Sequence, residues 1–156
     1  MKSYEKANQV MVDLFQKDYQ FALATVKDNV PSVRYIDTYY DNEAFYVVTY
    51  LKSQKAQEIL RNQHVALCHN LYRFNGKAYY IGHPKKDENQ EIRAKLIKAF
   101  EPWYFAHNNE EDENMAYIKI ELEDGFVYNN GIGYKVDFKN REAEEFPFDF
   151  NVVTVS

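Results

Sequence analysis

The 156-residue sequence predicts a mainly β (α+β) fold, in which antiparallel strands are flanked by helices. Tyr (14 residues) and Phe (11 residues) are abundant, and both favour strands over helices. Short strand-like runs follow one another with turn signals between them, a spacing typical of a barrel or a sandwich. The regular strand–helix alternation of a doubly wound sheet is missing. The length is that of one domain, which we expect to span residues 1–156.

Three segments have helical character. In the first, apolar residues recur at the spacing i, i+3, i+4, i+7 and i+8, namely Ala7, Val10, Met11, Leu14 and Phe15. The predicted helices are Tyr4–Lys17 with Ser3 as a cap, Ser53–Arg61 with Ser53 as a cap, and Asp87–Phe100 followed by Pro102.

The strands are expected between these helices and after the last one. The predicted strands are Gln20–Lys27, Val33–Tyr40, Ala44–Tyr50, His64–Phe74, Lys77–Gly82, Ala116–Leu122, Phe126–Asn129 and Tyr134–Phe138. The predicted turns are Asp28–Asn29, Asp41–Asn42, Asn75–Gly76, Glu123–Gly125 and Asn130–Gly133. Pro31 should interrupt strand pairing, because proline has no backbone N–H to donate. The tail after Asn140 is acidic and then aromatic, with Phe146, Phe148 and Phe150.

An anion site is predicted where the hairpin of Val33–Tyr40 and Ala44–Tyr50 meets the second helix. Continuing its register places Ile36 opposite Thr49 and Arg34 opposite Leu51, so Arg34 and Thr49 share one face of the sheet. The chain then reaches Ser53–Lys55 at a helix start, where unpaired N–H groups and the helix dipole favour an anion. An Arg fork and a Lys charge match the oxygens of a phosphate.

Other roles for the same residues stay open at this point. Serine at a helix start is usually only a cap, and a lysine in the first turn is usually solvated. Arg34 fits the edge of a sheet equally well without any ligand.

The segments "VRYID" (33–37) and "VTYLKSQK" (48–55) resemble the pyridoxamine-phosphate-oxidase-like FMN-binding split-barrel family. The order of the neighbouring segments "FALATV" (21–26) and "NQHVALCHN" (62–70) agrees with that family. The segment "KLIKAFEPWY" (95–104) resembles the general-stress-protein branch. The resemblance spans residues 5 to 138 and implies an antiparallel split β-barrel that binds FMN.

The resemblance also implies which residues would bind FMN. The Arg and the Thr…Ser-x-Lys group would hold the phosphate, the backbone of residues 35–37 would line the flavin ring, and Trp103 would cover the ring from a partner subunit. Trp103 could equally plug the edge of the core. The implied cofactor-binding residues are Arg34, Tyr35, Ile36, Asp37, Val48, Thr49, Ser53, Gln54, Lys55 and Trp103. The implied assembly is a homodimer with the flavin at the seam.

Three departures narrow the implied activity. No histidine follows His107, so the Arg–His segment with which the oxidases grip their substrate is missing, which argues against oxidation of a pyridoxine phosphate. The histidine that nitroimidazole-reductase relatives carry near the position of Thr49 is also missing. Gln54 stands where the oxidases often have Arg, which weakens or removes one phosphate contact.

Composition excludes several classes of partner and cofactor. The formal net charge is −5 and the Lys and Arg residues form no run, which argues against nucleic acid and anionic membranes. Cys68 cannot form an internal disulfide and is expected to be a buried small hydrophobe. His64 and His69 are five apart on a predicted strand, so they should not share a metal ion. Without a signal peptide or an apolar span, a cytoplasmic protein is expected.

Two functions remain open from the sequence. One is an FMN-dependent oxidoreductase that acts on a small molecule, in which the flavin carries the chemistry. The other is a flavin-binding stress or sensing module without fast turnover. Reduction kinetics with NADH or NADPH would separate them, and the sequence contains no nicotinamide-binding fingerprint that decides.

Overall fold

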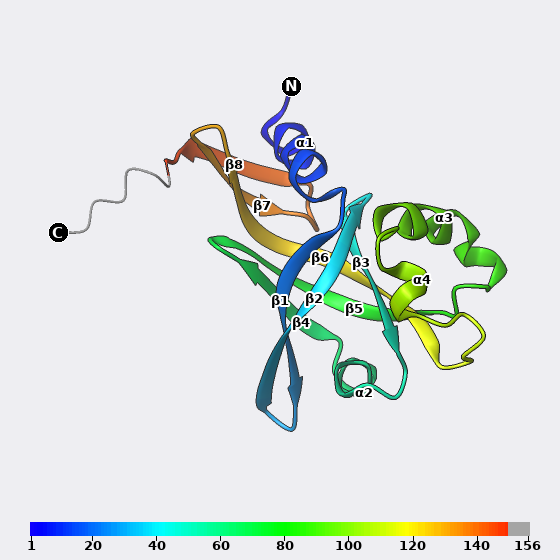
Figure 1. The fold of residues 1–156 in the computed structure, drawn as a ribbon. Coiled ribbons are helices and arrows are strands. Elements are labelled where there is room, and N and C mark those ends of the chain that lie inside the picture. Colours follow the sequence, from blue (N-terminus) through cyan, green and yellow to red (C-terminus); the bar gives the residue numbers. More distant parts are fainter. Residues whose placement is uncertain (150–156) are drawn as a thin grey trace.

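The computed structural model describes residues 1–149, which form an eight-stranded antiparallel sheet with helices against its rim (Figure 1). The strands lie in the order β3-β2-β1-β4-β5-β6-β7-β8, and an additional β3–β6 pairing closes the first six strands into a barrel. The fold class is therefore the predicted antiparallel split β-barrel. The strands are β1 (Tyr19–Lys27), β2 (Val30–Asp41), β3 (Ala44–Tyr50), β4 (His64–His69), β5 (Tyr72–Gly82), β6 (Met115–Asn129), β7 (Ile132–Asp137) and β8 (Glu142–Pro147).

The helices lie outside the barrel on three sides (Figure 1). They are α1 (Ser3–Phe15), α2 (Gln54–Arg61), the short 3-10 helix η1 (Asp87–Asn89), α3 (Gln90–Ala99) and α4 (Tyr104–His107). All three predicted helices exist, and Ser53 caps α2 as expected. The cap of α1 was assigned wrongly, because the N-cap residue is Lys2 and the Ser3 hydroxyl donates a hydrogen bond to Glu145 instead. Among the described residues, no helix has the length and apolar character needed to cross a membrane.

The first hairpin forms where the sequence places it. Asp28 and Asn29 both have positive φ (51° and 62°), as a two-residue hairpin turn between β1 and β2 requires. Pro31 does not interrupt the pairing, because it lies opposite Val26 inside β2. At that point β2 pairs with β1 alone, so the missing N–H faces away from the ladder.

The predicted turn at Asn75–Gly76 is wrong. The β4–β5 hairpin turns at Asn70–Leu71, where Asn70 has φ 52°, and β5 runs straight through Gly76. Gly76 lies at a register shift between β5 and β6, and a Cβ atom there would be 2.5 Å from the backbone oxygen of Glu121. The glycine therefore permits a close backbone approach within a strand rather than a turn.

The C-terminal strands also differ from the prediction. The expected turn at Glu123–Gly125 lies inside the single long strand β6, and the irregularity appears only as the register shift against β5. The acidic tail forms an additional strand, β8, which pairs with β7. Phe150 lies outside the described residues. Cys68 is exposed rather than buried, because the alternation along β4 turns Val65 and Leu67 inward.

Two separate hydrophobic clusters support the barrel. The main core fills the barrel and the face beneath α1, and Phe15, Phe21, Phe45 and Phe74 pack edge-on or tilted at its centre. The second cluster lies between α3, α4 and the outer faces of β3 and β6, and includes Leu96, Phe100, Tyr104, Met115 and Tyr117. Helix α2 lies at the lower end of the barrel in this view, opposite α1 (Figure 1).

Gly76→Ala should lower the free energy of unfolding by about 1–3 kcal/mol, because the added methyl group overpacks the β5–β6 contact. Urea denaturation measures this loss. Lys77→Ala on the same strand serves as the control and should change stability by less than about 0.5 kcal/mol. Equal losses for the two variants would contradict the close-approach role of Gly76.

Candidate functional site

The start of α2 and the end of β3 form the floor of the candidate site. The Ser53 side chain accepts a hydrogen bond from the backbone N–H of Ala56 at 3.3 Å, and its hydroxyl lies 3.2 Å from that of Thr49. Thr49 is 3% exposed and is held in place by pairing with Ala116 of β6. The N–H groups of Gln54 and Lys55, in the first turn, have no acceptor within the helix. These donors point out of the helix start, as an anion site requires.

Arg34 is connected to this site by its contact with α2 and not by the predicted β2–β3 register. The β2–β3 pairing extends over only three residue pairs, from Tyr39–Tyr46 to Asp41–Ala44. Beyond them the strands diverge, so Arg34 pairs with Leu23 of β1 and the predicted Arg34–Leu51 and Ile36–Thr49 pairs do not form. The guanidinium instead contacts Glu58 of α2 at 3.2 Å.

Arg34 is held by three acceptors. Its Nη1 donates to the Thr25 hydroxyl at 2.7 Å and to the Leu23 carbonyl at 3.3 Å, and its Nη2 donates to the Glu58 carboxylate. The same carboxylate accepts hydrogen bonds from Thr25 at 2.9 Å and from Ser32 at 3.3 Å. This network fixes the guanidinium against the barrel wall.

Lys55 is the second cation of the site. It is partly buried and, among residues 1–149, forms no ion pair within 4.0 Å. Burial and then the nearby charge of Arg34 lower the pKa of the Lys55 ammonium below its ordinary value. Two like charges therefore lie close together in a partly desolvated place, where their repulsion is relieved by a bound anion.

Glu58 is the only carboxylate in contact with these cations within the described chain. It is 3% exposed. Burial acts to raise the pKa of its carboxyl, but the hydrogen bonds from Thr25 and Ser32 and the charge of Arg34 outweigh burial and lower it. Glu58 is therefore ionised at neutral pH.

The other predicted residues surround this cluster in different ways. Tyr35 is 71% exposed on the outer face of β2, whereas the Ile36 side chain is buried in the main core. Gln54 is exposed and hydrogen-bonds to Glu58. Val48 packs against the second cluster. Only the backbone of Ile36 could thus face a ligand on the outer side of β2.

Asp37 and Trp103 meet at a second location, through Asp18. Burial, and then the charge of Asp18 and a hydrogen bond with it, raise the pKa of Asp37 to about 6. The Trp103 indole N–H donates a hydrogen bond to Oδ2 of Asp18, the other member of this carboxyl pair, with an N···O distance of 2.8 Å. Its ring stacks on Phe100 with centroids 4.5 Å apart. In one chain Trp103 therefore plugs the edge of the second cluster, and its role toward a ligand of a partner subunit stays a prediction.

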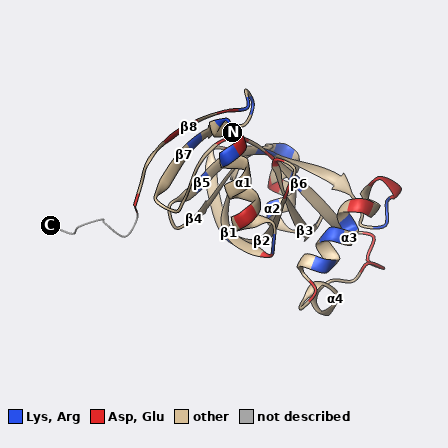
Figure 2. Ribbon diagram, turned by 90° about the horizontal axis from the view of Figure 1, so that it is seen from above, with Lys and Arg blue, Asp and Glu red and all other residues tan. Residues whose placement is uncertain are grey.

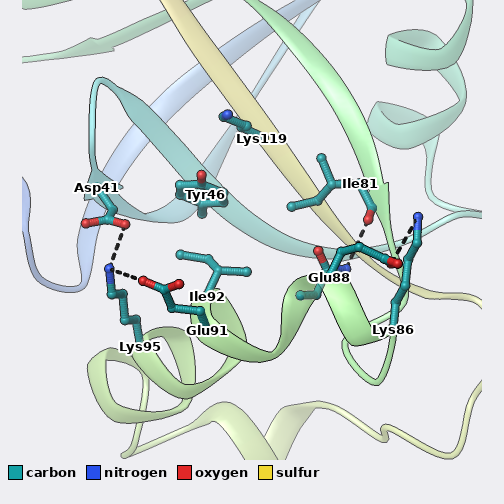
Figure 3. A pocket seen from close by; sticks show the side chains of 10 residues that line it. Asp41, Tyr46, Ile81, Lys86, Glu88, Glu91, Ile92, Lys95 and Lys119 are labelled. Atoms are coloured by element: carbon teal, nitrogen blue, oxygen red, sulfur yellow. Dashed lines mark hydrogen bonds and ion pairs between the residues drawn. The ribbon is translucent and has the colours of Figure 1, made fainter.

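A cavity of about 490 Å³ lies elsewhere, between α3 and strands β3, β5 and β6 (Figure 3). Its lysines are all paired: Lys95 with Asp41 and Glu91, Lys86 with Glu88, and Lys119 with Glu121. Figure 2 likewise shows basic and acidic residues side by side on α3 and the loop next to it. This cavity offers no uncompensated charge to a ligand, whereas the start of α2 does.

Sequence reasoning missed Thr25, Ser32 and Glu58. One signal was available for Glu58, since a residue three positions after Lys55 lies on the same face of a helix. Thr25 and Ser32 are opposed in the β1–β2 register, which the turn at Asp28–Asn29 determines. Their convergence on Glu58 depends on the docking of α2 against β1, which no local pattern shows.

These features define a split-barrel protein with two cationic side chains, Arg34 and Lys55, close together at the start of α2. The sequence pattern of the pyridoxamine 5'-phosphate oxidase family matches residues 7–129, and the chain belongs to this family. General stress protein 26 of Bacillus subtilis is 29% identical over 128 residues, which are 79% of this chain and 89% of that protein.

Solved structures share the fold. General stress protein 26 of Bacillus anthracis superposes with a TM-score of 0.58 at 18% identity, over 91% of this chain and 98% of that one. A putative pyridoxamine 5'-phosphate oxidase of Listeria innocua gives the same TM-score at 20% identity, over 81% and 98%. The heme storage protein HutZ of Vibrio cholerae gives 0.60 at 14% identity, over 79% and 92%. The chain is thus a split-barrel protein of a cofactor-binding family, and one of its neighbours in fold is a heme storage protein.

Asp37→Asn should change the pH dependence of stability. The pKa of Asp37 is raised to about 6, so between about pH 4 and 6 the folded chain keeps a proton that the unfolded chain releases, and stability falls as pH rises. The variant should lack this fall and gain about 1 kcal/mol over wild type between pH 4 and pH 7.5, less than the full linkage value because the pair is partly solvated. Urea denaturation at both pH values tests this, and parallel curves for the two proteins would contradict the carboxyl pair.

Proposed function

We propose that this protein binds FMN, with Arg34, Lys55 and the start of α2 on the phosphate, and that it acts as an FMN-dependent oxidoreductase. The observation that carries the proposal is the pairing of two like charges, of which Lys55 has no counter-charge among the described residues. A phosphate with one to two negative charges completes this site electrostatically. The membership of the family supports a flavin as the bearer of that phosphate.

The donor set fits a terminal phosphate. Arg34 contributes a fixed fork, Lys55 a point charge, and the Gln54 and Lys55 backbone two N–H donors. The Ser53 and Thr49 hydroxyls, 3.2 Å apart, add two groups at the same end of the barrel.

The flavin ring would then extend from the phosphate along β2. There the backbone of residues 35–37 is available, because Tyr35 projects outward and Ile36 inward. Bound FMN would supply hydride or single-electron transfer, and the protein would bind and orient it and exclude water. The substrate class is a small molecule.

A flavin-binding module without fast turnover is the second candidate. The observation in its favour is that, among the described residues, the Asp37 carboxyl with its raised pKa interacts with Asp18, which also accepts the Trp103 indole N–H, and not with Arg34 or Glu58. Stopped-flow reduction by NADH or NADPH and reoxidation by an acceptor separate the two. Turnover at rates above about 1 s⁻¹ supports the enzyme.

Alanine substitution of Arg34 or Lys55 should weaken FMN binding by roughly 10- to 100-fold, because a hydrogen bond to a charged group contributes about 1.5–3 kcal/mol. Riboflavin has the same ring and no phosphate, so its weaker binding should hardly change. The double substitution should cost less than the sum, because both residues serve one phosphate. Fluorescence titration of both flavins into the four proteins measures these effects.

The outcomes separate the possible ligands. Equal losses for FMN and riboflavin would show that the two residues support the ring or the fold. A purified wild-type protein with the spectrum of heme, or without affinity for FMN, would refute the proposal itself.

We further propose that the protein is a cytoplasmic homodimer. Val33 and Tyr35 are 69% and 71% exposed at alternating positions of β2, so they form an apolar row on one face of the strand. This row borders the expected position of the ring, as an interface that completes a flavin site would.

Light scattering should give twice the 18.6 kDa mass of one chain. Tyr35→Glu should dissociate the dimer and reduce FMN affinity at least tenfold, because a desolvated charge in an interface core costs on the order of a few kcal/mol. Leu71→Glu, at the exposed turn between β4 and β5, serves as the control and should leave both unchanged. A single-chain mass with FMN bound would overturn the dimer.

A further inference from the structure

The buried Glu58 carboxylate is a negative charge within a site that is proposed to bind an anion. It lies behind Arg34, 3.2 Å from the guanidinium. A carboxylate there repels the phosphate that Arg34 and Lys55 attract. Of the three charges that the described chain brings together, two are positive and one is negative, so the empty site carries a net charge of +1 rather than +2.

Arg34 has two hydrogen-bond acceptors besides Glu58. Thr25 Oγ1 and the Leu23 carbonyl accept hydrogen bonds from Nη1 and would remain if the charge of Glu58 were removed. A glutamine at position 58 also keeps an oxygen that can accept from Thr25 and Arg34, and its amide can donate to the Ser32 hydroxyl. The negative charge of Glu58 is therefore separable from its hydrogen-bonding role.

We propose that Glu58 is a specificity-determining residue whose charge limits the affinity of the site for phosphate-bearing ligands. This inference rests on the proposed function. The carboxylate relieves the repulsion between Arg34 and Lys55 in the empty protein, which stabilises that state, and opposes the phosphate in the loaded one. Both effects lower the affinity for a phosphate, so the ligand stays exchangeable instead of becoming permanently bound.

The alternative is that Glu58 only pins Arg34 in place, and the two roles predict opposite signs. If the charge limits affinity, Glu58→Gln binds FMN more tightly. If the carboxylate is needed as a pin, the same variant binds FMN more weakly, because Arg34 loses its position.

The experiment is titration of FMN, riboflavin and inorganic phosphate into wild type and Glu58→Gln at constant ionic strength. We expect the Kd for FMN to fall roughly tenfold, as removal of a charge several ångströms from a phosphate in a partly buried site implies. The Kd for inorganic phosphate should also fall, and the Kd for riboflavin should change by less than about twofold, since riboflavin carries no charge. The melting temperature of the ligand-free variant should fall, and saturating FMN should raise it by more than in wild type.

Glu110→Gln is the matched control. Glu110 is another nearly buried carboxylate, held by Arg93 in two hydrogen bonds of 2.6 and 2.9 Å beneath α3, away from the start of α2. It should lower the melting temperature without altering the ratio of FMN to riboflavin affinity. An unchanged or increased Kd for FMN in Glu58→Gln overturns the inference.

A second variant keeps the test decisive if Glu58→Gln does not fold. Glu58→Asp retains the charge, so its Kd for FMN should stay within about threefold of wild type, whereas a loss above tenfold specific to FMN would show that the pin matters and not the charge. The proposed function fails separately, if wild type binds FMN no better than riboflavin. In that case the response of inorganic phosphate to Glu58→Gln still decides whether the charge controls the site.

Discussion

The pairing of β6 with both β5 and β3 is the constraint on which the rest of the structure depends. Strand β6, 15 residues long, is the last of the six strands in spatial order, and its pairing with β3, the first, closes the barrel. Closure draws β3 away from β2 after three residue pairs and holds Thr49 opposite Ala116. The chain leaving β3 then enters α2 at the mouth of the barrel, and the outer faces of β3 and β6 are left for α3 and α4 to cover. Both the candidate site and the second cluster follow from this closure.

Helix α2 converts the closed barrel into a site. Ser53 at its cap contacts Thr49 of β3, Lys55 lies in its first turn, and Glu58 one turn on contacts Thr25 of β1 and Arg34 of β2. The contrast with α3 is informative. There every lysine lining the large cavity has a carboxylate within 4.0 Å, and Arg93 is matched by Glu110. Charges that stabilise the fold are paired, and the described chain leaves a partly buried cation unpaired where a ligand is proposed.

The sequence by itself determined the class of fold and most of the local structure. Helical periodicity identified all three long helices, Ser53 was recognised as a cap, and the two-residue turn at Asp28–Asn29 was located correctly. These features depend on interactions between residues close in sequence, which a local pattern records. The anion site at Ser53–Lys55 was reachable for the same reason, because a helix start is a local structure with predictable free donors. Pattern failed where local chemistry was ambiguous: Asn75–Gly76 has the composition of a turn but serves a close approach between β5 and β6.

Only the tertiary structure decided how the parts of the site meet. The sequence suggested that the β2–β3 register joins Arg34 to Thr49, but closure by β6 ends that register and α2 makes the connection through Glu58. Thr25, Ser32 and Glu58 come together from three elements, and Asp18, Asp37 and Trp103 from three segments far apart in the sequence. The reason is physical: the burial and pKa of a charged side chain depend on neighbours distant in sequence, and their positions are set by the closed barrel and the docking of helices on it.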